Sequence, residues 1–175
     1  MCGILGNFGF IEYDDFNNHL SRSNDSLLRR GPDQRNNIDI ENFLATHSRL
    51  IIQGNVEDGT QPACFKNIVT LFNGNLYNKN SIKKDLELLG YDFEGVSDTE
   101  VVAKSIYHWG NKAYEKFNGF FSIASFNKDQ KSLVLSRDRL GQKPLYYSKN
   151  ARSVFFGSTE NLVPKKFCGN LRKES

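Results

Sequence analysis

The residues best placed to do chemistry are the first four, Met1-Cys2-Gly3-Ile4. Removal of Met1 is expected because the residue after it is small, and it would make Cys2 the N-terminal residue. Cys2 would then carry a thiol nucleophile and an α-amine that can act as its base. Free thiols titrate near ~8.5 and α-amines near ~7.7 to 8.0, so a minority of each is reactive at neutral pH. An N-terminal amine that activates its own side chain is one route to a covalent nucleophile.

The N-terminal residues also allow less reactive roles. A small buried cysteine is a common core residue, so Cys2 alone can equally be structural. The apolar run at residues 3–11 could belong to a secretion signal, but it lacks a basic segment and is interrupted by Asn7 and by glycines. Myristoylation needs glycine directly after Met1, where this chain has Cys2. We therefore reject the secretion signal and the myristoyl anchor.

Length and composition indicate one globular domain. The 175 residues are 38% hydrophobic and 25% charged, which suits a single core that buries roughly two thirds of the unfolded surface. The net charge is only +3 and the basic residues are scattered, so nucleic acid is not implied, and no apolar run could span a bilayer. Cys2, Cys64 and Cys168 form no CxxC pair. We expect no disulfide framework, no metal site and a reducing cytoplasm.

The elements that must hold Cys2 begin with a buried strand that carries it at its tip. In chain order, the first half is expected to contain a strand at 3–11, a helix at 14–30 with a possible break at 23–25, and strands at 43–52 and 68–72. The last of these strands is expected to run into a turn at residues 73–75. The first strand would hold the Cys2 thiol rigidly in place.

The second half is expected to be helical first and then β. In chain order, we expect helices at 78–90, 99–107 and 113–117, and short strands at 120–126, 132–137, 144–148 and 154–157. Ser97 or Asp98 should cap the middle helix, and three or four of the strands should form a meander. Strands, then helices, then strands indicate an α+β fold with two facing sheets between helical layers. We expect one domain at residues 1–163 and a short polar tail at residues 164–175.

Several motifs in order match one family. They are Met1-Cys2-Gly3-Ile4, Arg30-Gly31-Pro32-Asp33, His47-Ser48-Arg49-Leu50, Gln61-Pro62, Asn73-Gly74-Asn75-Leu76-Tyr77-Asn78, Ser97-Asp98-Thr99-Glu100, Asn118-Gly119-Phe120-Phe121 and residues 137–147, RDRLGQKPLYY. Over about residues 1–163 the chain resembles the class II glutamine amidotransferases, and in particular the glutaminase half of glutamine-hydrolysing asparagine synthetase.

The resemblance implies an N-terminal-nucleophile fold, which is a four-layer αββα sandwich, and hydrolysis of glutamine to glutamate and ammonia. By this resemblance the Cys2 thiolate attacks the amide carbon, its α-amine carries the proton to ammonia, and water cleaves the thioester. The side-chain amide of Asn73 and the backbone N–H of Gly74 would stabilise the oxyanion.

The resemblance also assigns residues that hold free glutamine. Arg49 would clamp the α-carboxylate and Asp98 would receive the α-ammonium, with Asn75 beside it. Backbone groups near Leu50 and Ile52 would complete the wall. We expect four further residues, Arg30, Asp33, Arg137 and Asp138, to support the site structurally.

Without the resemblance, these residues have simpler roles open to them. Asn73-Gly74 is typical of a hairpin turn, Asp98 of a helix cap, and Arg49 of a surface ion pair. The three histidines, His19, His47 and His108, have no spacing that supports a metal site or a Cys-His pair.

The chain also departs from the family pattern. Asn75 stands where the family usually has Glu, Arg29 where it often has His, and Ser48 where it often has Glu. The loss of a carboxylate at Asn75 predicts weaker binding of glutamine. After residue 163 nothing resembles the ATP-pyrophosphatase domain, so we expect no cofactor here, and ATP and magnesium only for a synthetase domain that this sequence does not contain.

Two functions therefore compete at the level of sequence. The first is a glutaminase that takes L-glutamine and gives ammonia to a synthetase domain or subunit. The alternative is a catalytically silent module that senses glutamine or docks a partner. An N-terminal-nucleophile peptidase is disfavoured because Arg49 and Asp98 would select a free amino acid.

Overall fold

A computed structural model of the chain describes residues 2–11, 13–51, 59–95 and 97–164. In chain order the elements are β1 (Gly3–Gly9), α1 (Tyr13–Arg22), α2 (Asn24–Arg30), β2 (Gln34–Ile40), β3 (Phe43–Arg49), β4 (Ala63–Phe65), β5 (Ile68–Leu76), α3 (Lys79–Leu88), α4 (Asp98–Trp109), α5 (Lys112–Lys116), β6 (Gly119–Asn127), β7 (Ser132–Arg137), β8 (Tyr146–Lys149), β9 (Ser153–Gly157) and the 3-10 helix η1 (Glu160–Leu162).

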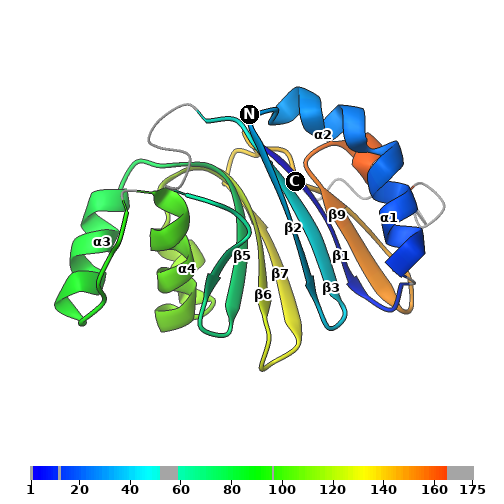
Figure 1. The fold of residues 1–175 in the computed structure, drawn as a ribbon. Helices are drawn as coiled ribbons and strands as arrows, with labels where there is room; N and C mark the ends of the chain where they lie inside the picture. The colour runs from blue at the N-terminus through cyan, green and yellow to red at the C-terminus, as the bar shows by residue number, and fades with distance from the viewer. Residues whose placement is uncertain (1, 12, 52–58, 96, 165–175) are drawn as a thin grey trace.

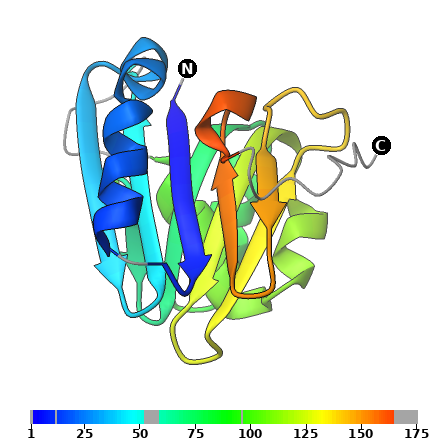
Figure 2. The ribbon, with the colours of Figure 1, turned by 90° about the vertical axis from the view of Figure 1, so that its right-hand side faces the viewer.

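Two antiparallel sheets lie face to face, with helices on the outer side of each. One sheet has the order β2-β3-β1-β9-β8 and the other the order β4-β5-β6-β7. Helices α1 and α2 cover the first sheet, whereas α3 and α4 cover the second (Figure 1). Figure 2 looks at the molecule from the side of α1 and shows β1 beside β9, its partner in the first sheet. The expected αββα sandwich is confirmed.

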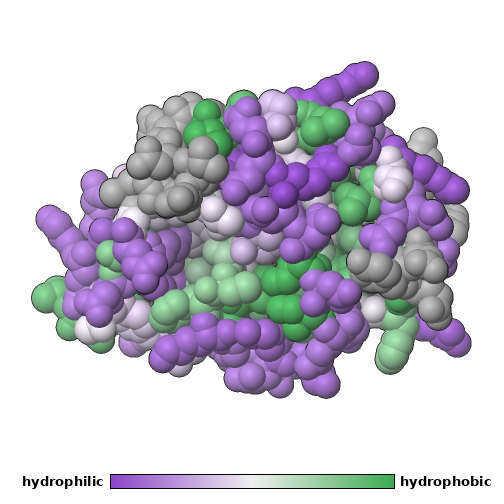
Figure 3. Space-filling view, in the orientation of Figure 1, coloured by the Kyte–Doolittle hydropathy of each residue, from purple (hydrophilic) through white to green (hydrophobic). Residues whose placement is uncertain are grey.

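The main core lies between the sheets and follows the two-residue period of the strands. Ile4 of β1, Leu71 of β5 and Ala124 of β6 are all buried in it. Successive side chains of a strand point to opposite faces, so even positions of β1 and β6 and odd positions of β5 face the other sheet. Figure 3 shows hydrophobic side chains at the middle of the visible face, over the seam between the sheets.

The outer cores hold the helices against the sheets. Leu86 of α3, Val102 of α4 and Ile123 of β6 belong to one apolar cluster. On the opposite side, Leu27 of α2 packs with Leu5 of β1. Leu27 thus holds α2 against β1, and Leu86 and Val102 hold α3 and α4 against the second sheet.

Parts of the expected architecture are corrected by the structure. The turn expected at residues 73–75 is wrong, because β5 continues to Leu76 and pairs with β6 along its whole length. Strands β2 and β4 have no counterpart among the expected elements. The late strands do not form one meander: β6 and β7 pair in one sheet, whereas β8 and β9 pair in the other. The break expected within the first helix is confirmed between α1 and α2.

His47 of β3 connects the two sheets and should make stability depend on pH. Its ring is 1% exposed, and Nε2 lies 3.3 Å from the backbone oxygen of Phe72 in β5, to which it can donate. Burial lowers the pKa of His47 to about 4; the bond to Phe72 opposes this shift and the charge of Arg49 adds to it. Below about pH 6.5, His47 is therefore protonated in the unfolded chain, whereas in the folded chain it stays neutral down to about pH 4.

We expect the free energy of unfolding to fall by about 2 kcal/mol between pH 7 and pH 5 because of this one residue. Urea unfolding at both pH values measures the fall. The variant His47→Gln keeps a donor for Phe72 but does not titrate, so its stability should change much less over the same interval. An equal fall in both proteins would contradict the assignment to His47.

Candidate active site

Cys2 and Arg49 come together at one end of the first sheet. Gly3 of β1 lies opposite Ser48 of β3 in the antiparallel register, so the residues one step outward, Cys2 and Arg49, are neighbours at this edge. The chain begins at this edge of the sandwich (Figure 1). Because Cys2 has the same parity as Ile4, its side chain is directed to the second sheet.

The backbone around Cys2 is held by the segment that follows α2. Arg30 Nε donates to the oxygen of Cys2 at 3.0 Å, and the Cys2 sulfur lies 4.0 Å from the oxygen of Leu50. Asp33 accepts from the N–H of Ile51 at 2.7 Å and donates its own N–H to the oxygen of Arg49 at 3.1 Å. Arg30 and Asp33 thus tie the start of β1 to the end of β3.

Arg30 carries its charge close to Cys2. Burial lowers the pKa of Arg30, and the negative charge that Cys2 gains as a thiolate opposes that shift. A guanidinium stays protonated at neutral pH even when its pKa is lowered. Arg30 therefore supplies a fixed positive charge beside the thiol.

The second sheet contributes the end of β5. Hydrogen bonds from Lys128 N to Asn67 O and from Tyr77 N to Asn118 O flank its ladder with β6. Ladder bonds of an antiparallel pair alternate, so the even residues of β5 point their N–H groups away from β6. The N–H of Phe72 donates to Gln61 Oε1 at 2.6 Å and that of Leu76 donates to Asp98 Oδ2 at 3.0 Å.

The N–H of Gly74 lies between the N–H groups of Phe72 and Leu76, and it also points away from β6. No side-chain acceptor for it is found among the residues that the structure describes. A side chain is not tolerated at this position: a Cβ on Gly74 would lie 2.1 Å from the oxygen of Phe120 and 2.7 Å from Phe121 Cα. Glycine is thus required here by the close approach of β6, while its N–H remains available to a ligand.

Asn73 presents a second donor beside Gly74. Its side chain faces the first sheet and is 2% exposed, and Nδ2 is buried with no hydrogen-bond partner within the described part of the chain. Buried polar groups are nearly always paired, so such an exception points to a role beyond packing. Asn73 Nδ2 and Gly74 N–H are two unused donors at adjacent residues.

Gly59 places Arg49 close to the start of α4. Its φ is +82°, and a Cβ there would lie 3.3 Å from Arg49 Nη2 and 3.1 Å from Ser97 Cβ. Ser97 caps α4 by accepting from the N–H of Glu100. The guanidinium of Arg49, which also donates to Gln34 Oε1 at 3.4 Å, therefore lies near Ser97, one residue before Asp98.

Asp98, the first residue of α4, reaches the end of β5. One carboxylate oxygen accepts from Leu76 N, and the other forms an ion pair with Lys79 Nζ at 3.0 Å. Sequence reasoning did not assign Lys79 a role, because only the fold brings the first turn of α3 to Asp98. Asn75, one residue before Leu76, is exposed. The carboxylate of Asp98 thus already has a cationic partner in Lys79.

Asp138 organises the loop between β7 and β8. Its carboxylate accepts from four backbone N–H groups, those of Phe121, Leu140, Gln142 and Lys143, at 2.9 to 3.2 Å. Burial alone would raise the pKa of Asp138, but these donors outweigh it and the pKa is lowered. These four bonds order the backbone of the loop. Arg137 beside Asp138 lies against Gly141, with its Nη1 3.3 Å from where a Cβ on that glycine would be.

Lys143 connects this loop to Cys2 and to β6. Its ammonium lies 4.7 Å from the ring centre of Phe120, the cross-strand partner of Asn75. Burial lowers the pKa of Lys143 and Arg30 adds to this, whereas Cys2 and Asp138 act in the opposite direction. Lys143 thus lies beside Phe120 of β6, which pairs with the end of β5.

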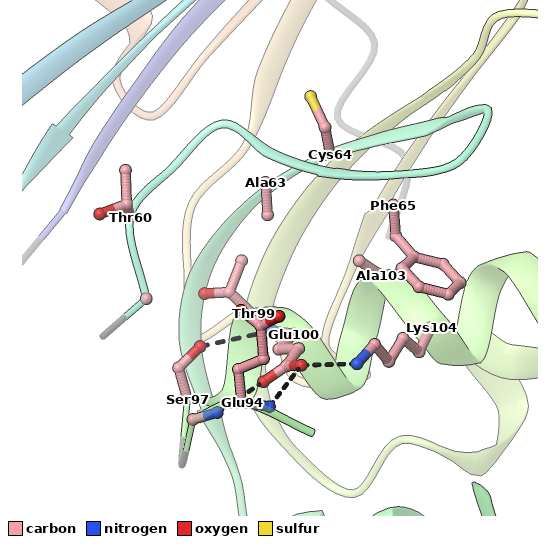
Figure 4. A pocket seen from close by; sticks show the side chains of 12 residues that line it. Thr60, Ala63, Cys64, Phe65, Glu94, Ser97, Thr99, Glu100, Ala103 and Lys104 are labelled. Carbon is pink, nitrogen blue, oxygen red and sulfur yellow. Dashed lines mark hydrogen bonds and ion pairs between the residues drawn. The ribbon is translucent and has the colours of Figure 1, made fainter. Parts of the chain in front are cut away.

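A neighbouring pocket of about 530 Å³ lies between β4 and the start of α4, and Gly59 and Ser97 belong to its lining (Figure 4). It is bounded by Cys64, Glu100 and Lys104, and it contains neither Cys2 nor Asn73. Lys104 Nζ lies 2.5 Å from Glu100 Oε1, while Glu100 also accepts from the N–H groups of Glu94 and Gly95. These charged groups satisfy one another, so we regard the pocket as structural.

The structure thus brings together most of the residues proposed from sequence. Cys2, Leu50, Arg30 and Asp33 share one edge with Arg49, and the end of β5 with Asp98 faces it. Ile52 lies outside the described residues. Within the described ranges, no three His, Cys, Asp or Glu side chains gather as metal ligands. Nor does any described helix have the length and apolar character needed to cross a membrane.

The αββα sandwich is the fold of the N-terminal-nucleophile hydrolases, and Cys2 lies at one end of its first sheet. A sequence profile of the glutamine amidotransferase domain matches residues 1–174. The chain therefore belongs to the glutamine amidotransferase domain family.

Individual relatives agree with this family. Asparagine synthetase [glutamine-hydrolyzing] 3 of Bacillus subtilis (strain 168) is 37% identical over 169 residues, which cover 90% of this chain and 26% of the relative. Asparagine synthetase [glutamine-hydrolyzing] 1 of the same organism is 33% identical over 163 residues, with the same coverage. The chain thus spans about a quarter of the length of these curated relatives.

A solved structure supports the fold independently. Glutamine phosphoribosylpyrophosphate amidotransferase from B. subtilis superposes with a TM-score of 0.72 at 20% identity, over 90% of this chain and 42% of that one. At this identity the likeness concerns the fold alone.

Proposed function

We propose that this chain hydrolyses the side-chain amide of L-glutamine to glutamate and ammonia through a thioester on Cys2. The observation that carries the proposal is the pair of unused donors, Asn73 Nδ2 and Gly74 N–H, at the edge that faces Cys2. Acyl transfer needs donors already in place where the oxyanion develops. Membership of the family supports the same chemistry.

The mechanism follows from the arrangement of these groups. Once Met1 is removed, the α-amine of Cys2 takes the thiol proton while the sulfur attacks the amide carbon. The negative oxygen is held by Asn73 and Gly74, and the amine passes its proton to the departing ammonia. Water then attacks the thioester, with the same amine as base, and releases glutamate.

Arg49 and Asp98 would hold the two charged ends of the substrate. A guanidinium binds a carboxylate with two parallel bonds, and a carboxylate accepts from an ammonium, so together they select a free amino acid. We propose that the ammonia is used by a synthetase domain or subunit, which would bring its own ATP and magnesium. A cytoplasmic setting is proposed because the thiol of Cys2 must stay reduced.

A silent glutamine-binding module is the second candidate. Two observations favour it: Asp98 is already paired with Lys79, and Asn75 offers no carboxylate to the substrate ammonium. The two candidates differ in whether ammonia is released from glutamine. An assay of ammonia and glutamate with purified chain decides between them, and binding without turnover would overturn the first.

Asp98→Asn is expected to raise the KM for glutamine by about 10- to 100-fold, because a hydrogen bond to a charged group is lost. The asparagine can still accept from Leu76 N, so the end of β5 should keep its place. Steady-state kinetics of glutamine hydrolysis measure the change.

Lys79→Met is the matched control for this prediction. It removes the same ion pair but leaves the carboxylate of Asp98 free for the substrate. KM should then stay the same or fall. If Lys79→Met raised KM as much as Asp98→Asn, the carboxylate would be structural and would not bind substrate.

A further inference from the structure

The residue directly across the ladder from Asn73 is Ser122. Ser122 of β6 lies opposite Asn73 of β5 in the antiparallel register, at a position where the two backbones exchange hydrogen bonds. Side chains of such a pair have Cβ atoms about 4.5 to 5.5 Å apart. Ser122 has the same parity as Ala124 and Phe126, which face the first sheet, so both side chains project to the side of Cys2.

Both residues hold a polar atom with no partner. Ser122 is 0% exposed, and its Oγ is buried without a hydrogen bond, as is Asn73 Nδ2, within the described residues. An enclosed polar atom that makes no bond is costly, and two of them side by side are unusual. Each such group needs an explanation, and a catalytic role is one of those known.

The chemistry of the two side chains explains the pair. A hydroxyl can both donate and accept, so Ser122 Oγ could pair with either end of the Asn73 amide, whereas Nδ2 can only donate. In this structure Ser122 Oγ pairs with neither end. For the Ser122 hydroxyl to donate to Asn73 Oδ1, the two side chains would have to rotate toward each other.

The other cross-strand neighbour does not compete for this hydroxyl. Arg137 of β7 lies opposite Ser122, but it is exposed and the Ser122 oxygen remains without a partner. Ser122 is thus available to Asn73 alone among the described side chains next to it in the sheet.

We propose that Ser122 is a positioning residue that orients the amide of Asn73 for oxyanion stabilisation. The inference rests on the proposed glutaminase function. In the productive orientation the Ser122 hydroxyl donates to Asn73 Oδ1, and Asn73 Nδ2 donates to the oxygen of the substrate. Ser122 touches no reacting atom and acts only through Asn73.

Ser122→Ala is expected to lower kcat by about 3- to 10-fold with KM within about twofold, because one neutral hydrogen bond is lost in the transition state. Its melting temperature should not fall, since the mutation removes an unpaired buried hydroxyl. A structural serine would behave in the opposite way, with lower stability and little change in kcat.

Ser125→Ala is the matched control on the same strand. Ser125 is buried on the opposite face, where its hydroxyl lies 2.5 Å from that of Tyr114. This variant should lose stability and keep kcat. The contrast separates an effect on the amide of Asn73 from a general effect on β6.

A double-mutant cycle tests whether Ser122 affects kcat through Asn73. In the Asn73→Ala background, Ser122→Ala should cause no further fall in kcat, because its partner is gone. Additive losses would overturn the inference, as would a Ser122→Ala protein with wild-type kcat. Both outcomes leave the glutaminase function intact, whereas a wild-type protein that releases no ammonia would overturn the function itself and the inference with it.

Discussion

Cys2→Ala is expected to lower the rate of glutamine hydrolysis by a factor on the order of 10⁴ or more, because the covalent route loses its nucleophile. The fold should survive. The Cys2 side chain is only half-buried, and its sulfur contact to the oxygen of Leu50 is long at 4.0 Å. Release of ammonia and glutamate, measured against a melting curve, separates lost chemistry from lost structure.

Intact mass provides the complementary measurement. The wild-type chain should lack Met1 and gain a single adduct from 6-diazo-5-oxo-L-norleucine, a glutamine mimic that alkylates reactive amidotransferase cysteines, and the adduct should be absent in Cys2→Ala. Cys64→Ala serves as control, because the reagent can reach the exposed Cys64, although partial burial of its thiol raises the pKa and so disfavours the reactive thiolate. Full activity in Cys2→Ala, or an adduct that follows Cys64, would contradict the assignment.

The placement of Cys2 depends on residues that do no chemistry themselves. Arg30 at the end of α2 bonds the oxygen of Cys2, and Asp33 bonds the strand end that carries Arg49. The nucleophile and the proposed carboxylate clamp are thus fixed to each other through one short segment. Precise placement of reacting groups accounts for a large share of catalysis, which is why a densely bonded segment is expected here.

The parts of the fold that sequence could predict are those with strong local signals. The apolar run after Cys2, the break between α1 and α2, and the cap at Ser97 all depend on neighbouring residues. The spacing of apolar residues in α3 and α4 likewise predicts which face of each helix is buried. These elements appear in the structure close to the expected bounds.

The parts that sequence could not predict depend on tertiary contacts. Strand β2, with the sequence QRNNIDI, is too polar to be recognised. Among the described strands it pairs with β3 alone, at the edge of its sheet, where polar side chains are tolerated. Asn73-Gly74 is a turn signal in isolation, but pairing with β6 keeps it extended. The ion pair between Lys79 and Asp98 and the cross-strand pairing of Asn73 with Ser122 likewise exist only in the folded chain.

Asn73→Ala is expected to lower kcat by roughly 10² to 10³, the usual cost of one oxyanion donor. The amide is at the right place for this role, since it is 2% exposed, faces the sheet that carries Cys2 and has no other partner for Nδ2 in the described chain. The donor acts mainly in the transition state, so kcat and kcat/KM should fall together while KM changes little.

Asn7→Ala is the matched control for this prediction. Asn7 is also a fully buried asparagine in a strand, but its Nδ2 is used by the oxygen of Val154, 3.4 Å away, on the opposite face of the first sheet from Cys2. Its replacement should lower the melting temperature and leave kcat unchanged. Asn73→Ala should lower kcat and leave the melting temperature unchanged, because it removes a donor that makes no bond in the free protein. A fall in stability with unchanged kcat at Asn73 would show that the amide supports the fold, and oxyanion stabilisation would then have to come from Gly74 alone.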